Sequence, residues 1–124
     1  MSLKISKKKF IYLISPNKIS NEEVSLKTID CLKNSVPNEV PGIAFLSGGQ
    51  SEIEATENLN LINKNNNTNF LMTYSYGRAL QQSALKVWSK NIKNVEATQT
   101  TFNHRAKMCT LAALGKWSSE LEDK

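Results

Sequence analysis

The chain has 124 residues, of which 40% are apolar, and a formal net charge of +5. This length is enough for one small domain or for part of a larger one. No segment approaches the roughly 18 consecutive apolar residues of a membrane-spanning helix, so no membrane partner is expected. The apolar run Phe10–Ile14 is shorter than a secretory signal core of about 7–15 residues, which predicts a cytoplasmic protein. We interpret the two cysteines, Cys31 and Cys109, as packing residues because they are too few for a disulfide framework.

The basic charge is concentrated at the N-terminus. Four of the five net charges come from Lys4, Lys7, Lys8 and Lys9. A nucleic-acid groove would instead spread basic and aromatic residues along an element, so no nucleic-acid partner is expected. We interpret residues 1–15 as a basic segment that is disordered or unrelated to the rest.

The first predicted element is a helix over residues 20–36. Ser20 and Glu23 have the spacing of a capping box, in which each side chain bonds the other residue's backbone N–H. Apolar residues recur at helical spacing at Ile29, Leu32 and Val36. Pro37 and Pro41 end this helix.

Two uninterrupted apolar runs come next, each followed by a helical pattern. GIAFLSG, 42–48, and FLMTYS, 70–75, predict strands that are buried on both faces. The helix after the first begins with a second capping box, Ser51 with Glu54, and its apolar residues are Ala55, Leu59 and Ile62. The helix after the second has Leu80, Ala84 and Val87 on one side. A polar loop, NKNNNTN, separates the two units.

The last predicted helix covers residues 91–114, with a break early on. Its apolar stripe is Phe102, Ala106, Cys109 and Ala113. Gly115 is a natural helix terminator, and we expect residues 116–124 to form a frayed tail. Strands that alternate with helices predict an α/β fold built from parallel units. Two strands are too few for a stable sheet, which indicates part of a larger one.

The two turns after the strands share serine and glycine. Glycines allow close backbone approach, and a helix N-terminus offers unpaired N–H groups to an anion. Arg78, beside the second turn, is a cation suited to phosphate. Each turn alone is equally well explained as a helix-capping turn, but the pair favours a phosphate site. In a (β/α)8 barrel such a site commonly lies on the loops after the last two strands.

These residues resemble class I fructose-bisphosphate aldolase. The resemblance is carried by GIAFLSGGQSEIEATENLNLINK followed by TYSYGRALQQSALKVW, and it extends over residues 16–115. It covers only the C-terminal part of the family's chain, and so implies an incomplete (β/α)8 barrel. The family's enzyme is a glycolytic lyase, usually a homotetramer. It cleaves fructose 1,6-bisphosphate into dihydroxyacetone phosphate and glyceraldehyde 3-phosphate through a lysine Schiff base, without metal or cofactor.

The resemblance also implies which residues hold the phosphate at the ketose end of the substrate. In the first turn these are Ser47, Gly48 and Gly49, and in the second they are Ser75, Tyr76, Gly77 and Arg78. We assign no catalytic residue and no metal ligand.

The family's Schiff-base lysine has no clear counterpart. It lies in an LLKPN-type motif, and the nearest match is LISPN, 13–17, with Ser15 at the lysine position. An ungapped alignment from the following helix places that position near Ile5 instead, between Lys4 and Lys7. A serine cannot form an imine, so catalysis by this chain alone is not expected.

Two functions therefore remain open. The chain is either part of an aldolase that holds the substrate phosphate, or an inactive remnant that binds sugar phosphate or associates with full-length aldolase subunits. Binding of nucleic acid or of acidic surfaces by Lys4 to Lys9 is a weaker third possibility.

Several other side chains are assigned structural roles. His104 has no second histidine to share a metal. Trp88 and Trp117 are interpreted as packing residues. Three glutamates at the start of one helix complement its dipole: Glu52, Glu54 and Glu57.

Overall fold

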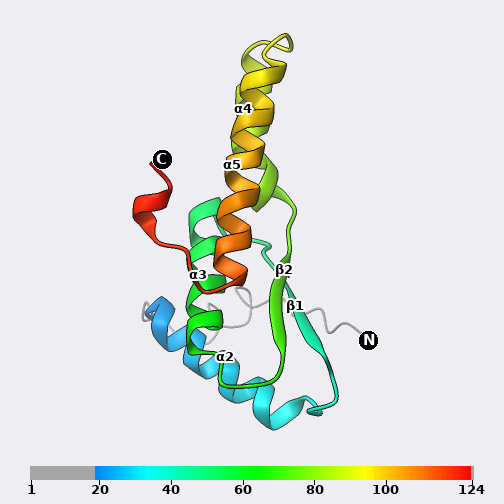
Figure 1. Ribbon diagram of the computed structural model, residues 1–124, viewed down its shortest axis with the longest axis vertical. Coiled ribbons are helices and arrows are strands. Elements are labelled where there is room, and N and C mark those ends of the chain that lie inside the picture. The colour runs from blue at the N-terminus through cyan, green and yellow to red at the C-terminus, as the bar shows by residue number, and fades with distance from the viewer. Residues whose placement is uncertain (1–18, 124) are drawn as a thin grey trace.

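The computed structural model describes residues 19–123 (Figure 1). Its elements are α2 (Asn21–Ser35), β1 (Gly42–Leu46), α3 (Glu52–Asn65), β2 (Leu71–Ser75), α4 (Arg78–Lys90), α5 (Val95–Ala113) and the 3-10 turn η1 (Ser119–Leu121). This order matches the predicted alternation of helices and strands. The basic segment and both candidate positions of the Schiff-base lysine lie outside the described residues. No helix in the described part of the chain is long and apolar enough to cross a membrane.

The two strands form a parallel sheet in which Gly42 pairs with Leu71 and Leu46 with Ser75. The prediction that both strands are buried on both faces was wrong. Residues of β1 alternate between half-buried and buried, and β2 departs further from the prediction. Its residues alternate between buried and exposed, and Leu71 is 79% exposed. One face of each strand packs against helices, whereas no element among residues 19–123 covers the other face of β2. The apolar run in the sequence thus predicted a burial of β2 that residues 19–123 do not provide.

The helix ends follow their local sequence signals. The Ser20 hydroxyl accepts from the Glu23 N–H at 3.2 Å. At α3 the capping box is complete, because Ser51 Oγ accepts from the Glu54 N–H and Glu54 accepts from the Ser51 N–H at 2.8 Å. Helix α5 ends at Gly115, whose φ of 67° requires the left-handed region. Lys116 N–H donates to the Leu111 carbonyl across this turn, which completes a Schellman motif.

The hydrophobic core lies between the sheet and the helices α2, α3 and α5. Phe45 and Leu59 are completely buried at its centre. The other large apolar side chains in this core are Ile29, Leu32, Ile43, Ile62, Phe70, Met72, Tyr74, Met108 and Trp117. The predicted positions Ile29, Leu32, Leu59 and Ile62 are thus confirmed as core residues. Cys31, predicted to pack, is exposed instead, whereas Cys109 is buried.

Helices α4 and α5 form a hairpin that projects beyond the sheet (Figure 1). The predicted break falls at residues 91–94, where a turn separates the two helices. The buried side of α5 is displaced from the predicted stripe: Arg105, Met108, Cys109 and Ala112 are buried, while Phe102 is exposed. Trp88 is 47% exposed and therefore not the packing residue that we expected. Both aromatic residues line a groove of about 630 Å³ between these helices.

Asparagine side chains at the end of α3 and in the loop after it bond to neighbouring elements. The Asn63 amide group donates to the carbonyl groups of Leu59, Met72 and Ala112 at 3.1–3.2 Å. It therefore joins α3 to β2 and to α5. Asn66 donates to the Phe70 carbonyl at 2.9 Å and so closes the turn into β2.

The C-terminal segment is docked, and the prediction of a frayed tail does not hold for residues 116–123. Trp117 is only 7% exposed, and its backbone N–H donates to the Asn60 side chain at 3.0 Å. The Trp117 indole N–H donates to Glu122 at 2.7 Å. Trp117 and Glu122 thus attach this polar segment to the rest of the protein near its two ends.

Candidate phosphate-binding site

The fold places the two serine-glycine turns next to each other. Parallel strands have their carboxyl ends at the same edge of the sheet, and Leu46 pairs with Ser75. Residues 47–51 and 76–77 leave the sheet from these neighbouring positions and lead into α3 and α4, respectively. The structure thus brings together the two loops that carry the predicted phosphate contacts.

The first turn is compact and tied to the protein. Ser47 is only 5% exposed, and its carbonyl accepts from the Gln50 N–H at 3.2 Å. Gly49 has a φ of 80°, which side chains other than glycine rarely adopt. Gly48 is exposed, and no protein atom lies within 4 Å of where its Cβ would be. The backbone at Gly48 is therefore open to a ligand.

The second turn leads into a helix without an internal cap. Gly77 is the N-cap of α4, has no side chain to accept from the first turn, and has open space around its Cβ position. The first turn of α4 contains no acidic residue, and Arg78 begins it in an exposed position. Helix α3, by contrast, has its own capping box, and Glu52 and Glu54 place negative charge in its first turn. The free N–H groups and the positive end of the dipole are therefore concentrated at α4.

Tyr76 supports the second turn from inside the protein. Its ring lies edge-on to Tyr74 at a centroid distance of 5.6 Å, and Tyr74 makes the same contact with Phe45 at 5.8 Å. Burial raises the pKa of Tyr76 above its ordinary value, and the adjacent Cys109 raises it further. The phenol is thus a neutral group at the back of the turn, and Ser75, Gly77 and Arg78 form its exposed front.

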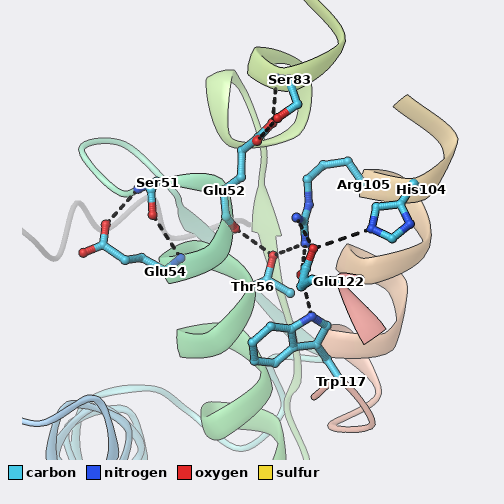
Figure 2. Close-up of polar contacts among 9 residues, drawn as sticks. All are labelled: Ser51, Glu52, Glu54, Thr56, Ser83, His104, Arg105, Trp117 and Glu122. Carbon is cyan, nitrogen blue, oxygen red and sulfur yellow. Dashed lines mark hydrogen bonds and ion pairs between the residues drawn. The ribbon is translucent and has the colours of Figure 1, made fainter. Parts of the chain in front are cut away.

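A hydrogen-bond network that the sequence did not reveal connects the helices behind the turns (Figure 2). Arg105 is 4% exposed, and its guanidinium donates to both carboxylate oxygens of Glu122 at 2.7 Å. It also donates to the Thr56 hydroxyl at 3.0 Å. Glu52, predicted only to complement a helix dipole, also accepts from the backbone N–H and the hydroxyl group of Ser83 on α4. The sequence contains no pattern that indicates the pairing of Arg105 with Glu122, because it does not show which arginine is buried.

The network sets the charge state of its members. Burial alone would raise the pKa of Glu122, but hydrogen bonds from Arg105 and Trp117 outweigh it and hold that pKa below the ordinary value. Burial would likewise lower the pKa of Arg105, and its bonds to Glu122 raise it. Arg105 and Glu122 are therefore both ionised at neutral pH. His104 lies 3.6 Å from Glu122 at the edge of the same network.

Among residues 19–123 there is no group of three histidine, cysteine or acidic side chains that could hold a metal ion. The α4–α5 groove lies along the hairpin and contains none of the predicted phosphate contacts. The site of interest is therefore the exposed surface of the two turns.

Comparisons with known proteins identify the origin of this arrangement. The family model for fructose-bisphosphate aldolase class-I matches residues 13–124. Fructose-bisphosphate aldolase 2 of Caenorhabditis elegans is 49% identical over 107 residues, which are 86% of this chain and 29% of that protein. The chloroplastic fructose-bisphosphate aldolase 2 of Arabidopsis thaliana is 48% identical over 110 residues, 89% of this chain and 27% of the relative.

A solved structure agrees with these relatives. Fructose-bisphosphate aldolase of Plasmodium falciparum, crystallised with TRAP and a small-molecule inhibitor, superposes with a TM-score of 0.79 at 40% identity, over 84% of this chain and 30% of that one. The two parallel strands and their helices are thus an incomplete portion of a (β/α)8 barrel. The chain belongs to the class I fructose-bisphosphate aldolase family. It spans less than a third of the length of these relatives.

Proposed function

We propose that this chain contributes the phosphate-binding portion of a class I aldolase site, which holds the ketose-end phosphate of fructose 1,6-bisphosphate or dihydroxyacetone phosphate. The observation that carries this proposal is the uncapped N-terminus of α4 beside the open Gly48 backbone, with Arg78 at its start. A phosphate fits because it accepts several N–H bonds at once and is attracted by both the dipole and the guanidinium.

The residues divide this task among them. Gly48 and Gly77 let the backbone approach the phosphate, because neither position has a side chain in the way. Gly49 supplies the tight turn and Ser75 a hydroxyl group. Tyr76 packs behind the turn. In the family's chemistry the phosphate grip orients a ketose whose carbonyl carbon reacts with a lysine. The described residues include no lysine in these two turns, and we assign catalysis to none of them.

The direct test is a titration of the full chain with inorganic phosphate and dihydroxyacetone phosphate, followed through backbone amide shifts. We expect millimolar binding, about −4 kcal/mol, with the largest shifts at residues 47–49 and 75–78. Arg78→Ala removes the cation at the start of α4, and we expect it to weaken binding by about tenfold. Lys90→Ala is the matched control, because Lys90 is an exposed cation at the other end of the same helix. If both variants weaken binding equally, the phosphate is attracted only by non-specific positive charge and the proposed site is refuted.

The Schiff-base question has a separate test. Borohydride reduction in the presence of dihydroxyacetone phosphate labels any lysine that forms an imine. We expect no label on this chain alone. A labelled lysine within residues 4–18 would show that the nucleophile is present despite Ser15.

A second candidate function is association with longer aldolase chains. The observation that favours it is the exposed face of β2, where Leu71 is almost fully accessible on a strand with only one neighbour among the described residues. Co-elution with a full-length class I aldolase in size-exclusion chromatography tests it. Leu71→Asp should abolish the complex, whereas Leu26→Asp, at an exposed leucine on α2, should leave it intact. If both variants still form the complex, the sheet is excluded as the interface.

A further inference from the structure

The helices that carry the two turns are joined directly. Glu52 is the first residue of α3, immediately after the first turn, and its carboxylate accepts from the Ser83 N–H at 2.9 Å and from the Ser83 hydroxyl. Ser83 lies in α4, which begins at the second turn. Side chains of α3 and α4 are thus held together within six residues of both helix starts. A ligand that contacts both turns depends on this spacing.

The same connection continues to the C-terminal segment (Figure 2). The Thr56 hydroxyl donates to the Glu52 carbonyl at 2.8 Å and accepts from Arg105 at 3.0 Å. Arg105 in turn donates two bonds to Glu122. Since Thr56 and Arg105 are both buried, water cannot easily replace these partners. The position of the α3 N-terminus therefore depends on whether residues 117–122 are docked.

Arg105 also reaches the second turn. Its charge acts on the Tyr76 phenol and partly opposes the rise in pKa that burial and Cys109 cause. The Arg105 Nε and the Tyr76 Oη are both buried, and both side chains lie beside Cys109. A change in the Arg105 position would thus alter the surroundings of the Tyr76 side chain, which lies behind the turn formed by Gly77 and Arg78.

We propose that Glu52 is a positioning residue for the phosphate site, and that docking of the C-terminal segment through Glu122 and Arg105 holds Glu52 and the two turns in their binding geometry. This inference rests on the proposed function, because it concerns the same phosphate grip. Neither glutamate is assigned a contact with phosphate. Both act through other residues, Glu52 through Ser83 and Glu122 through Arg105.

The experiment is the phosphate titration of the full 124-residue chain, with inorganic phosphate as the probe and amide shifts as the readout. Each variant is titrated under conditions in which circular dichroism shows it fully folded. We expect Glu52→Gln and Glu122→Gln to raise the Kd by about five- to tenfold. Glu96→Gln and Glu120→Gln are matched controls: each is an exposed glutamate, one in the first turn of α5 and one in the C-terminal segment. We expect both to keep the wild-type Kd.

Two further measurements separate positioning from stability. Ser83→Ala, which removes one of the two donors to Glu52, should raise the Kd, and Ser83→Thr, which keeps the hydroxyl, should restore it. In ligand-free Glu122→Gln, the amide resonances of Gly77 and Arg78 should already be displaced, although the substitution lies far away in the sequence. A variant that only lost stability would change the urea midpoint and leave both readouts unaltered.

The outcomes distinguish this inference from the function on which it rests. If Arg78→Ala weakens binding and the glutamate variants keep the wild-type Kd, the inference is overturned and the phosphate site stands. If the wild-type chain shows no phosphate-dependent shifts at residues 47–49 and 75–78, the proposed function fails first. Should Glu122→Gln fail to fold, Glu52→Gln and the Ser83 pair still decide, because they leave the bonds between Arg105 and Glu122 in place.

Discussion

Asn63 provides the sharpest test of how this fold is held together. It belongs to a stretch of asparagines that the sequence predicts as a polar loop, yet it lies in the last turn of α3 and its amide group donates to carbonyls of β2 and α5. Asn63→Ala deletes both tertiary hydrogen bonds, each worth about 1 kcal/mol net. The Ala112 carbonyl still accepts from the Gly115 N–H, whereas the Met72 carbonyl loses its bond from Asn63. We therefore expect a loss of about 2–3 kcal/mol, toward the upper end if that carbonyl stays buried.

Urea unfolding followed by far-ultraviolet circular dichroism measures this loss. A decrease of 2–3 kcal/mol corresponds to a midpoint lower by roughly 1–2 M. Asn67→Ala is the matched control, because Asn67 is an exposed asparagine in the same stretch, and we expect its effect to stay within about 0.5 kcal/mol. Equal midpoints for the two variants would refute the reasoning, since the joint between α3, β2 and α5 would then contribute nothing to stability.

Three further predictions concern the core, the network and the helix end. Phe45→Ala should cost about 3–5 kcal/mol in urea unfolding, because the side chain is fully buried, whereas Leu71→Ala on the open face should cost less than about 0.5 kcal/mol. Glu122→Gln should destabilise the chain at pH 7. Because the folded-state pKa of Glu122 lies below 4.5, this difference between wild type and variant should persist above about pH 4.5 and vanish as the pH falls through the folded-state pKa, which urea titrations across pH would reveal. Gly115→Ala should lower the thermal midpoint by an amount equivalent to about 1–2 kcal/mol, since φ is 67° and the new Cβ would lie 3.2 Å from a backbone nitrogen of α3; an unchanged midpoint would contradict this.

Local chemistry made much of the fold predictable. Ser51 and Glu54 determine where α3 begins because both partners of the capping box lie within one turn. Gly115 ends α5 for a reason that is equally local. The order of strands and helices followed from hydrophobic patterns, and the two turns were correctly placed at the ends of neighbouring strands.

The features that the sequence missed depend on distant partners. A buried arginine on α5 shifts the apolar stripe, and its bonds to Glu122 and Thr56 compensate for that burial. The docked tail has the same origin, because a polar segment reveals its partners only in three dimensions. Leu71 shows the opposite error: its apolar character suggested burial that residues 19–123 do not supply. The difference between the two turns was also invisible, because it depends on which helix already satisfies its own N-terminus.

The two-stranded sheet has a consequence for hydrogen exchange. In a parallel pair, alternate residues of each strand direct their N–H groups toward the partner, and the residues between them direct theirs outward. Within residues 19–123, where β1 and β2 pair only with each other, amide protection should therefore alternate from one residue to the next. Any neighbour that joined the sheet through the open edges would make that protection continuous. The exchange pattern of these ten residues thus reports whether the barrel around them is closed.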